Sequence, residues 1–442
     1  MLLHALLLLG NDTESECNMS TSFQSLGLEE PLLSTLAQLH FKVPSYIQAA
    51  CIPSILQGKN VIGVANTGCG KTAAFVIPII SMLSKDPFGI FALCLCPTRE
   101  LAYQIAEQLT LFSVYLSVSV EVLVGGEDVL KQSKSLLARP NVVVATPGRL
   151  VEHLIHSDDI KSCFLKLQCL ILDEADRLLD ASFDSELRYI LANLPRRRQT
   201  LMFSATITSN ISALQTLTGS NVVYFEESGR SKTVNTCEHL YSFMPEKIKD
   251  VYLVYFVRNL LPAVNRRAII FTSTIQKCEL ISQILSVMKI GSLSLHSVKR
   301  QAERRSTLSM FKSGIVNVLV ATDVAARGLD IPAVHLVINY DLSKDPTQYI
   351  HRVGRTARFQ AIGKALTLVT QYDVKSVKDI EKHIGKQLLE ISVDEEQLVT
   401  SIGEVFAARK LAKIRMATAG GFDETLLANK RRLSRRTISN DV

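Results

Sequence analysis

The sequence has no C-x-x-C pair, although it contains nine cysteines in 442 residues. Zinc ribbons and dithiol redox sites need cysteines at that spacing. Three of the cysteines, Cys94, Cys96 and Cys169, lie instead within apolar stretches that are typical of strands. Buried thiols of this kind are common in reducing compartments, where disulfides are rare. We therefore expect free thiols, no disulfides and no structural metal.

The N-terminus lacks the features of a membrane span or a signal peptide. Residues 1–9 are apolar, but nine residues are too few to cross a bilayer. They have no basic segment before them and no small-residue cleavage site, and the polar stretch 11–18 follows. We expect residues 1–22 to be a disordered leader with Met19 as an alternative start, and we expect no membrane partner.

Most of the chain has almost no net charge. The formal charge of the whole chain is +7. Residues 409–436 alone contain nine Lys or Arg and only two acidic residues, Asp423 and Glu424, which gives this segment a net charge of +7. The folded core is therefore nearly neutral. The basic tail can attract phosphate groups without sequence preference and in a salt-dependent manner. It also fits a nuclear localisation signal or a solubilising end.

The segment before this tail has the apolar spacing of a helix. Within residues 399–416 that spacing is carried by Ile402, Val405, Phe406, Leu411 and Ile414. We expect these residues to form a helix that docks on the preceding domain. A purely electrostatic tether is the alternative.

The body of the chain has the pattern of an α/β protein. Its mass of 48.9 kDa and 47% hydrophobic residues are enough for two or three domains with full cores. Apolar runs alternate with segments of helical period, which predicts parallel sheets covered by helices on both faces. These runs are residues 91–96, 141–145, 167–172, 267–272, 317–322 and 334–339.

A polar stretch at residues 226–236, containing Ser, Gly, Lys, Thr and Asn, predicts a flexible linker. It separates a first domain, residues 23–225, from a second, residues 237–385. Residues 386–442 would then form a basic C-terminal extension.

A Gly-rich loop follows one apolar run and leads into a helical pattern. Residues 65–72 read ANTGCGKT. In such loops backbone N–H groups surround phosphate oxygens, the lysine reaches the β- and γ-phosphates, and the Thr hydroxyl binds Mg²⁺. Ala65 stands at the first glycine of the strict G-x-x-x-x-G-K-T pattern, so the loop alone also fits a simple Gly-rich turn.

A pair of carboxylates supports the phosphate-loop interpretation. Asp173 and Glu174 follow the apolar residues 169–172, and α/β proteins place their chemistry at the carboxyl ends of strands. Asp173 can hold Mg²⁺, largely through water, and Glu174 can polarise an attacking water. An isolated Asp-Glu pair is usually solvated surface. After a buried strand and a phosphate loop, it indicates a nucleotide hydrolase.

The order of further motifs resembles the DEAD-box RNA helicases, from residue 23 to about residue 385. The motifs read PTRELA at 97–102, TPGR at 146–149, DEAD at 173–176, SAT at 204–206, ATDVAARGLD at 321–330 and HRVGRTAR at 351–358. No single motif is decisive, but their joint order is. The resemblance implies two RecA-like domains and RNA-stimulated ATP hydrolysis, with ATP and Mg²⁺ as cofactors.

The resemblance also implies the roles of individual residues. ATP binding falls to Phe23, Phe41, Gln48, Ala65, Asn66, Thr67, Gly68, Cys69, Gly70, Lys71 and Thr72, and to Gly328 and Asp330 in the second domain. Catalysis falls to Lys71, Glu174, Arg355 and Arg358, and Mg²⁺ binding to Thr72 and Asp173. Coupling of ATP hydrolysis to RNA strand separation falls to Asp176, Ser204, Thr206 and His351. The expected RNA contacts are Pro97, Thr98, Arg99, Gly126, Thr146 and Arg149, and in the second domain Gln301, Arg304 and Thr322.

The sequence departs from the family pattern near the adenine segment, residues 41–48, to which the resemblance assigns adenine recognition. His40 precedes Phe41 where Gly is usual, and Ser45 and Tyr46 replace Thr-Pro. A His has fewer backbone conformations than Gly, which bears on the placement of Phe41. Cys69 replaces a Ser or Ala in a loop where the backbone amide binds phosphate. We expect activity to survive these changes.

The implied mechanism needs both domains. The first brings Lys71 and Glu174, and the second brings Arg355 and Arg358, so closure on ATP and RNA would complete the site. An arginine supplied across a boundary is worth roughly 10³ to 10⁵ in phosphoryl-transfer rate. Contacts to phosphate and 2′-OH carry no sequence code. The expected outcome is local separation of RNA strands.

Two other functions fit parts of this pattern. A DNA translocase would share the phosphate loop and carboxylates, but Gln48 and the DEAD tetrad favour RNA. A non-unwinding ATP-dependent RNA clamp would share every motif. The segment 394–436 resembles the tail of the nucleolar ribosome-assembly branch, which implies rRNA processing in the nucleus and nucleolus, pre-ribosomal proteins as partners and a monomeric chain.

Overall fold

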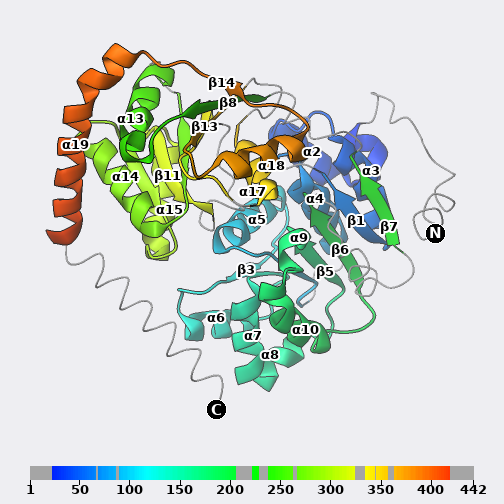
Figure 1. The fold of residues 1–442 in the computed structure, drawn as a ribbon. Coiled ribbons are helices and arrows are strands. Elements are labelled where there is room, and N and C mark those ends of the chain that lie inside the picture. The colour runs from blue at the N-terminus through cyan, green and yellow to red at the C-terminus, as the bar shows by residue number, and fades with distance from the viewer. Residues whose placement is uncertain are drawn as a thin grey trace, which may run out of the picture. The chain divides into compact units, whose positions relative to one another are not determined.

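The computed structural model describes residues 22–65, 68–85, 89–205, 222–227, 237–261, 266–323, 334–343, 345–356 and 363–418. The chain divides into two compact units, residues 1–228 and residues 229–442, called here the first and second unit. Each unit contains a seven-stranded sheet in which all neighbouring strands are parallel (Figure 1). The predicted α/β class with parallel sheets is confirmed.

The sheet of the first unit has the strand order β3-β4-β2-β5-β6-β1-β7. Its strands are β1 (Asn60–Val64), β2 (Ala92–Leu95), β3 (Val120–Leu123), β4 (Val142–Ala145), β5 (Cys169–Asp173), β6 (Gln199–Ser204) and β7 (Val222–Glu226). Its helices are η1 (Phe23–Leu26), α2 (Glu30–Gln38), α3 (Tyr46–Leu56), α4 (Lys71–Leu83), α5 (Arg99–Phe112), α6 (Val129–Leu137), α7 (Pro147–His156), α8 (Asp158–Cys163), α9 (Ala175–Leu178), η2 (Ala181–Phe183) and α10 (Asp184–Ala192).

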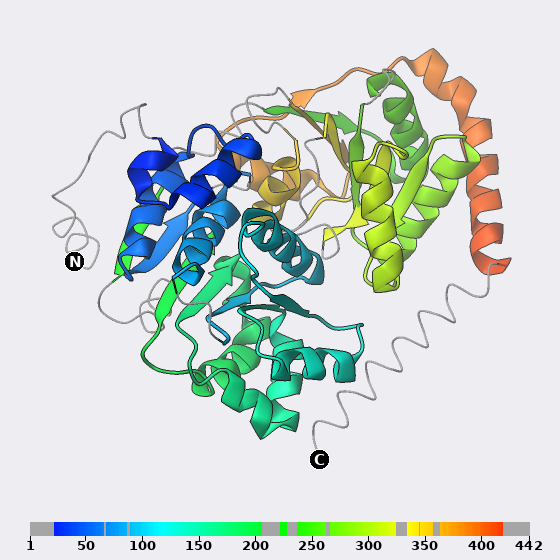
Figure 2. The same ribbon diagram turned by 180° about the vertical axis from the view of Figure 1, so that it is seen from behind.

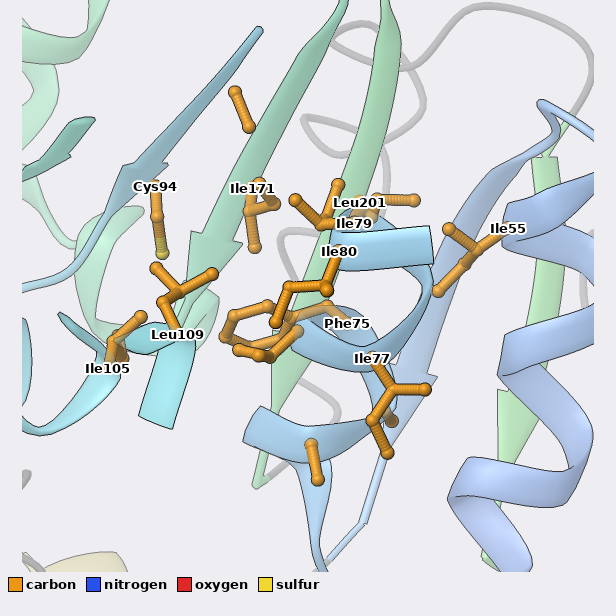
Figure 3. Packing of buried hydrophobic residues seen from close by; sticks show 14 of the residues in the cluster. Ile55, Phe75, Ile77, Ile79, Ile80, Cys94, Ile105, Leu109, Ile171 and Leu201 are labelled. Atoms are coloured by element: carbon orange, nitrogen blue, oxygen red, sulfur yellow. The ribbon is translucent and has the colours of Figure 1, made fainter. Parts of the chain in front are cut away.

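The central strands of this sheet are buried on both faces, because successive side chains enter different cores. Ile171 and Leu201 pack with Phe75 of α4 on one face, as Figure 3 shows. Their neighbours Leu170 and Met202 belong to the core on the opposite face. Continuous apolar runs in the sequence therefore become strands, and the order of those strands fixes which loops meet at the carboxyl edge of the sheet.

The sheet of the second unit has the strand order β10-β11-β9-β12-β13-β8-β14. Its strands are β8 (Cys237–Phe243), β9 (Ala268–Thr272), β10 (Ser292–Leu295), β11 (Val318–Thr322), β12 (Leu336–Asn339), β13 (Gly363–Val369) and β14 (Leu389–Glu390). Its helices are η3 (Glu246–Ile248), α13 (Lys249–Leu260), α14 (Ile275–Val287), α15 (Gln301–Lys312), α17 (Pro346–Val353), α18 (Val374–Ile384) and α19 (Glu395–Thr418).

The second unit extends beyond residue 385, where we expected the domain to end. Strand β14 pairs with β8, and helix α19 packs on α13 and α14 (Figures 1 and 2, orange to red). Leu398, Val405 and Ala412 of α19 are buried in the same core as the strands. Residues 389–418 are thus part of this unit. The linker that we expected at 226–236 lies largely outside the described residues.

The helix predicted before the basic tail is confirmed, but its expected buried face is only partly correct: Val405 is buried and Ile402 packs against the core, whereas the other three residues are exposed. Phe406, Leu411 and Ile414 are 43%, 43% and 50% exposed. Val405 is buried together with two alanines, Ala408 and Ala412. Small side chains let the helix approach α13 and α14 closely, and hydrophobicity alone does not reveal that preference.

Among the helices of the described ranges, none is both long and apolar enough to cross a membrane.

Candidate functional site

Three adjacent strands of the first unit bring the predicted ATP residues together. Strands β5, β6 and β1 are neighbours, and Asp173 at the end of β5 pairs with Phe203 of β6. Ser204 at the end of β6 pairs with Val64 of β1, and its carbonyl accepts a hydrogen bond from the Ala65 N–H at 3.1 Å. The carboxylates, the SAT motif and the phosphate loop therefore begin at one edge of the sheet.

The phosphate loop is shaped by glycines and held by helix α3. Gly68 and Gly70 have φ angles of 90° and 85°, which other residues rarely adopt. The Ser45 hydroxyl donates to the Cys69 carbonyl at 2.7 Å, and the Gln48 side-chain amide donates to the Gly70 carbonyl at 3.1 Å. Two carbonyls of the loop are thus fixed from the adenine segment. Asn66 and Thr67 lie outside the described residues.

Gln48 is buried, and its contacts within the described residues use half of the hydrogen-bonding capacity of its side chain. Its Oε1 accepts from the Ser45 N–H at 2.9 Å, and one of its two amide hydrogens is directed at Gly70. One N–H and one lone pair remain for an adenine edge. We gave Ser45 no role from sequence, although the S-x-x-Q spacing at the start of a helix is a capping signal that would have identified it.

Lys71 lies among three carboxylates. Its Nζ donates to the carbonyl of Ala65, so the side chain folds back over the loop. Burial lowers the pKa of Lys71, although Asp173, Asp176 and Glu174 oppose that change. Burial and then the charge of Glu174 raise the pKa of Asp173 to about 7, against the influence of Lys71. Both groups are displaced toward their neutral forms, chiefly because burial penalises the charged form of each.

The same cluster is suited to a divalent cation and a triphosphate. Asp173 is buried, with Oδ1 accepting from the Glu174 N–H at 3.0 Å, and the Thr72 hydroxyl follows Lys71 in the first turn of α4. Carboxylate and hydroxyl oxygens are hard ligands of the kind that Mg²⁺ prefers. The residues present therefore fit that ion.

Glu174 is held in an unusual backbone conformation. Its φ and ψ are both 51°, in the left-handed region, where it caps the short helix α9. Arg177 lies 3.4 Å from its carboxylate, and Asp176 accepts from the Arg177 N–H at 3.1 Å. This turn places Glu174 and Asp176 directly after the strand that ends at Asp173. Thr206 lies outside the described residues.

A strained residue directly precedes the adenine segment, and the last residues of that segment form the first turn of α3. His40 has a φ of 61°, which a Gly would adopt without cost. The departure from the family pattern is therefore accommodated, and Phe41 packs edge-on against Phe112 of α5 with ring centroids 5.2 Å apart. Phe23 is buried at the start of the unit. Stacking of either ring on adenine stays a prediction.

The other half of the same sheet edge collects the predicted RNA contacts. Strands β2, β4 and β3 are adjacent and precede, respectively, Pro97 to Arg99, Thr146, and Gly126. Arg99 is exposed, and its guanidinium lies so close to Gly126 that a Cβ there would approach Nη1 to 2.8 Å. Thr98 caps α5 by accepting from the Leu101 N–H. The φ of 94° at residue 126 favours glycine, whereas the Arg99 guanidinium ends a flexible side chain and could move away from an added Cβ.

Arg149 is buried, unlike Arg99. Its Nη1 donates to Gln132 at 3.1 Å and to the Glu127 carbonyl at 3.2 Å, and Nε lies 3.2 Å from Glu152. His153 joins the same network at Gln132 Oε1. These contacts hold helix α7 against the loop that contains Gly126. A direct contact of Arg149 with RNA stays a prediction.

In the second unit the described residues that we predicted lie in α15 after β10, at the end of β11, and in or just after α17. Gln301 and Arg304 are in the first turn of α15, Thr322 ends β11, and His351 lies in α17. The backbone of Arg355 is fixed by an N–H from Val334 at 3.1 Å. Gly328, Asp330 and Arg358 lie outside the described residues.

Sequence analysis gave no role to Arg352, which proves central to this unit. Its guanidinium binds both carboxylate oxygens of Asp323, at 2.6 and 2.7 Å, and donates to the Asn339 side chain and the Asp341 carbonyl. It thus ties the segment after Thr322 to the helix of His351. Its position inside the HRVGRTAR motif was the sequence feature that could have indicated this role.

Family models match both units. The model described as DEAD/DEAH box helicase matches residues 45–214, and the one described as Helicase conserved C-terminal domain matches residues 246–360. "DEAD-box ATP-dependent RNA helicase 36" of Arabidopsis thaliana is 41% identical over 429 residues, which cover 96% of this chain and 86% of that protein. "ATP-dependent rRNA helicase RRP3" of Coccidioides immitis is 44% identical, covering 91% and 84%.

A solved structure shows the same fold. S. cerevisiae Dbp5 bound to RNA and ADP BeF3 has a TM-score of 0.76 and 27% identity, covering 88% of this chain and 99% of that one. The folds are therefore RecA-like in both units. The chain belongs to the DEAD-box family of ATP-dependent RNA helicases, which are ATP-hydrolysing enzymes. The predicted family, fold and enzyme class are confirmed.

Proposed function

We propose that this chain uses RNA-stimulated ATP hydrolysis to separate RNA strands locally during rRNA processing and ribosome assembly. The observation that carries the proposal is the division of one sheet edge. The predicted ATP residues follow the ends of β5, β6 and β1, and the predicted RNA residues follow the ends of β2, β4 and β3. In this proposal, movement of one set is transmitted to the other through the sheet that they share.

In the first unit, the loop carbonyls fixed by Ser45 and Gln48 keep the backbone N–H groups of residues 68–70 available for phosphate. Lys71 then exchanges its contact with Ala65 for the β- and γ-phosphates. Mg²⁺ held by Thr72 and Asp173, largely through water, would neutralise charge on those phosphates. Glu174 orients the attacking water and accepts its proton.

The second unit completes the reaction in this proposal. Arg355 and Arg358 stabilise the charge that develops on the transferred phosphoryl group, and RNA bound to both units favours the closed state. Contacts from Arg99, Gly126, Gln301 and Thr322 to the RNA backbone would bend one strand of a duplex. Hydrolysis and product release then restore the open state.

The cellular assignment rests on the relatives and on the basic segment. The C. immitis relative is named an rRNA helicase, and residues 409–436 have a surplus of seven positive charges. We propose a nucleolar location, pre-ribosomal proteins as partners and a monomeric chain.

Two measurements test the proposal. ATP hydrolysis should rise with single-stranded RNA and not with DNA of the same sequence; equal stimulation would favour a DNA translocase. RNA crosslinked in cells to the Glu174→Gln variant, which should hold its substrate, should be enriched in rRNA precursors. Crosslinks spread evenly over messenger RNA would contradict the ribosomal role.

A further inference from the structure

We infer that Arg409 of helix α19 is a positioning residue for the ATPase half-site of the second unit. The inference rests on the proposed function, in which that unit supplies Arg355. Residue 409 lies beyond the part of the chain that the helicase family models match, which ends at residue 360. The inference comes from a continuous set of contacts between α19 and the HRVGRTAR segment.

The first part of the connection is a buried carboxylate. Arg409 Nη1 lies 3.0 Å from Asp250 Oδ2, and the Asp250 side chain is only 7% exposed. The other oxygen of Asp250 accepts the Tyr340 hydroxyl at 2.7 Å. Asp250 therefore joins helix α19 to the residue that follows strand β12. The Nζ of Lys249 lies 5.0 Å from the centroid of the Tyr340 ring, which restricts that ring further.

The second part leads from Tyr340 to the motif residues. Asp341, the next residue, accepts from Lys277 at 2.8 Å and from the N–H and hydroxyl of Ser273, both at 2.8 Å. Its carbonyl accepts from Arg352 Nη1 at 2.6 Å. Arg352 also binds Asp323, one residue after Thr322. The 340–341 peptide thus helps to hold Arg352. Arg352 in turn connects Asp323, which follows the predicted RNA contact Thr322, to the segment that contains the predicted catalytic residue Arg355.

Loss of Arg409 should be transmitted along these contacts. A buried carboxylate without its cation is costly and recruits other partners or water. Asp250 would then turn from Tyr340. Residues 340–341 would still be held by Phe271, Ser273 and Lys277, but without the anchored Tyr340 side chain the carbonyl of Asp341 would be placed less firmly relative to Arg352. The catalytic consequence is a less well placed Arg355, which lies three residues from Arg352 in the same segment. Poor placement lowers the rate of the chemical step more than substrate affinity.

The simpler alternative is that Arg409 only holds α19 on the rest of the second unit. The chain contains a matched control that tests this alternative. Arg258 of α13 binds Glu404 of α19 through two contacts of 3.2 Å. This pair joins the same two helices, but it is exposed and is not part of the Asp250 connection. Arg258→Gln therefore removes an arginine between α13 and α19 without disturbing Tyr340.

The test compares RNA-stimulated ATPase of full-length Arg409→Gln, Arg258→Gln and Arg409→Lys with the parent chain. We expect Arg409→Gln to lower kcat about tenfold with a small change in KM for ATP, Arg258→Gln to leave kcat unchanged, and Arg409→Lys to recover most of the loss. Thermal midpoints measured in parallel must show that all three are folded. Equal kcat values for the two Gln variants would overturn the inference.

A double-mutant cycle with Asp250→Asn decides whether the effect passes through the carboxylate. Asn still accepts the Tyr340 hydroxyl but needs no cation. In that background Arg409→Gln should cause little further loss of kcat. A full tenfold loss there would contradict the route through Asp250. If the parent chain shows no RNA-stimulated ATPase at all, the proposed function fails instead, which is a separate outcome.

Discussion

The side-chain amide of Gln48 donates a hydrogen bond of 3.1 Å to the carbonyl of Gly70, and so links the adenine segment to the phosphate loop. Gln48→Ala should therefore weaken binding of ATP and ADP, and should erode the preference for ATP over GTP. The unsatisfied loop carbonyl alone should cost about 1–3 kcal/mol. Titrations with ATP, ADP and GTP measure both effects. Comparable hydrolysis of ATP and GTP by the parent chain would refute the role of Gln48, and His40 would then be the residue to examine.

Lys71→Ala should lower RNA-stimulated ATPase by several orders of magnitude, since Lys71 neutralises charge on the transferred phosphoryl group. Circular dichroism should show that the fold is retained, because the side chain contacts the loop rather than the core. A variant that kept full activity would contradict the phosphate-loop assignment.

Glu174→Gln should behave differently from Lys71→Ala. It preserves the shape of the side chain at a strained backbone position but removes the group that accepts the proton of water. Hydrolysis should fall roughly 10²- to 10⁴-fold, the usual contribution of general base catalysis. ATP and RNA should nevertheless bind with parent affinity and dissociate more slowly. Stopped-flow release faster than in the parent chain would argue against this role.

Glu279 provides a test of stability against pH in the second unit. Burial would raise the pKa of Glu279, but hydrogen bonds from His296, Ser294 and Gln283 outweigh it and lower that pKa to about 2. A lowered pKa stabilises the fold above the ordinary carboxyl pKa of 4.5, and the benefit is lost as pH falls from there toward 2. Glu279→Gln should therefore destabilise this unit by up to about 3 kcal/mol at neutral pH.

The difference between Glu279→Gln and the parent should shrink progressively below about pH 4. Thermal midpoints at a series of pH values measure it. A constant difference at all pH values would mean that packing, and not the charge of Glu279, is responsible.

Two truncations separate the folded helix from the basic tail. A chain that ends after Ala408 loses the Arg409 contact with Asp250 and the buried Ala412, so its thermal midpoint should fall. A chain that ends after Thr418 keeps α19 and loses the basic residues 430–436. Its midpoint should be unchanged, while RNA affinity should weaken and depend less on salt. Equal midpoints for both truncations would restore the tether interpretation.

The central strands were predictable from sequence, since strands buried on both faces produce continuous apolar runs. The expected runs 141–145, 317–322 and 334–339 contain β4, β11 and β12. Strand β7 is different: residues 222–225 are apolar, but the strand lies at the edge of the sheet and is only partly buried, and we did not predict it. The buried face of α19 was not predictable either, since the alanines that it buries are not distinguished by hydrophobicity from exposed ones.

The residue types of the candidate site could be recognised from motif order, but their contacts could not. The motifs identified Gln48 and Lys71. They did not show that Ser45 fixes the phosphate loop or that the Arg149 side chain binds Gln132 in the interior. Such contacts depend on which strands are neighbours, and strand order is a property of the whole sheet. Arg352 was overlooked for the same reason, because its partners Asp323 and Asn339 come from other strands.

The central claim is that ATP hydrolysis by this chain separates RNA strands. The most direct measurement is displacement of a labelled strand from a short RNA duplex by the full-length protein with ATP and Mg²⁺. We predict displacement with ATP, and none with ADP or with the Lys71→Ala variant. RNA-stimulated ATP hydrolysis without any displaced strand would contradict the claim and identify the chain as an ATP-dependent RNA clamp.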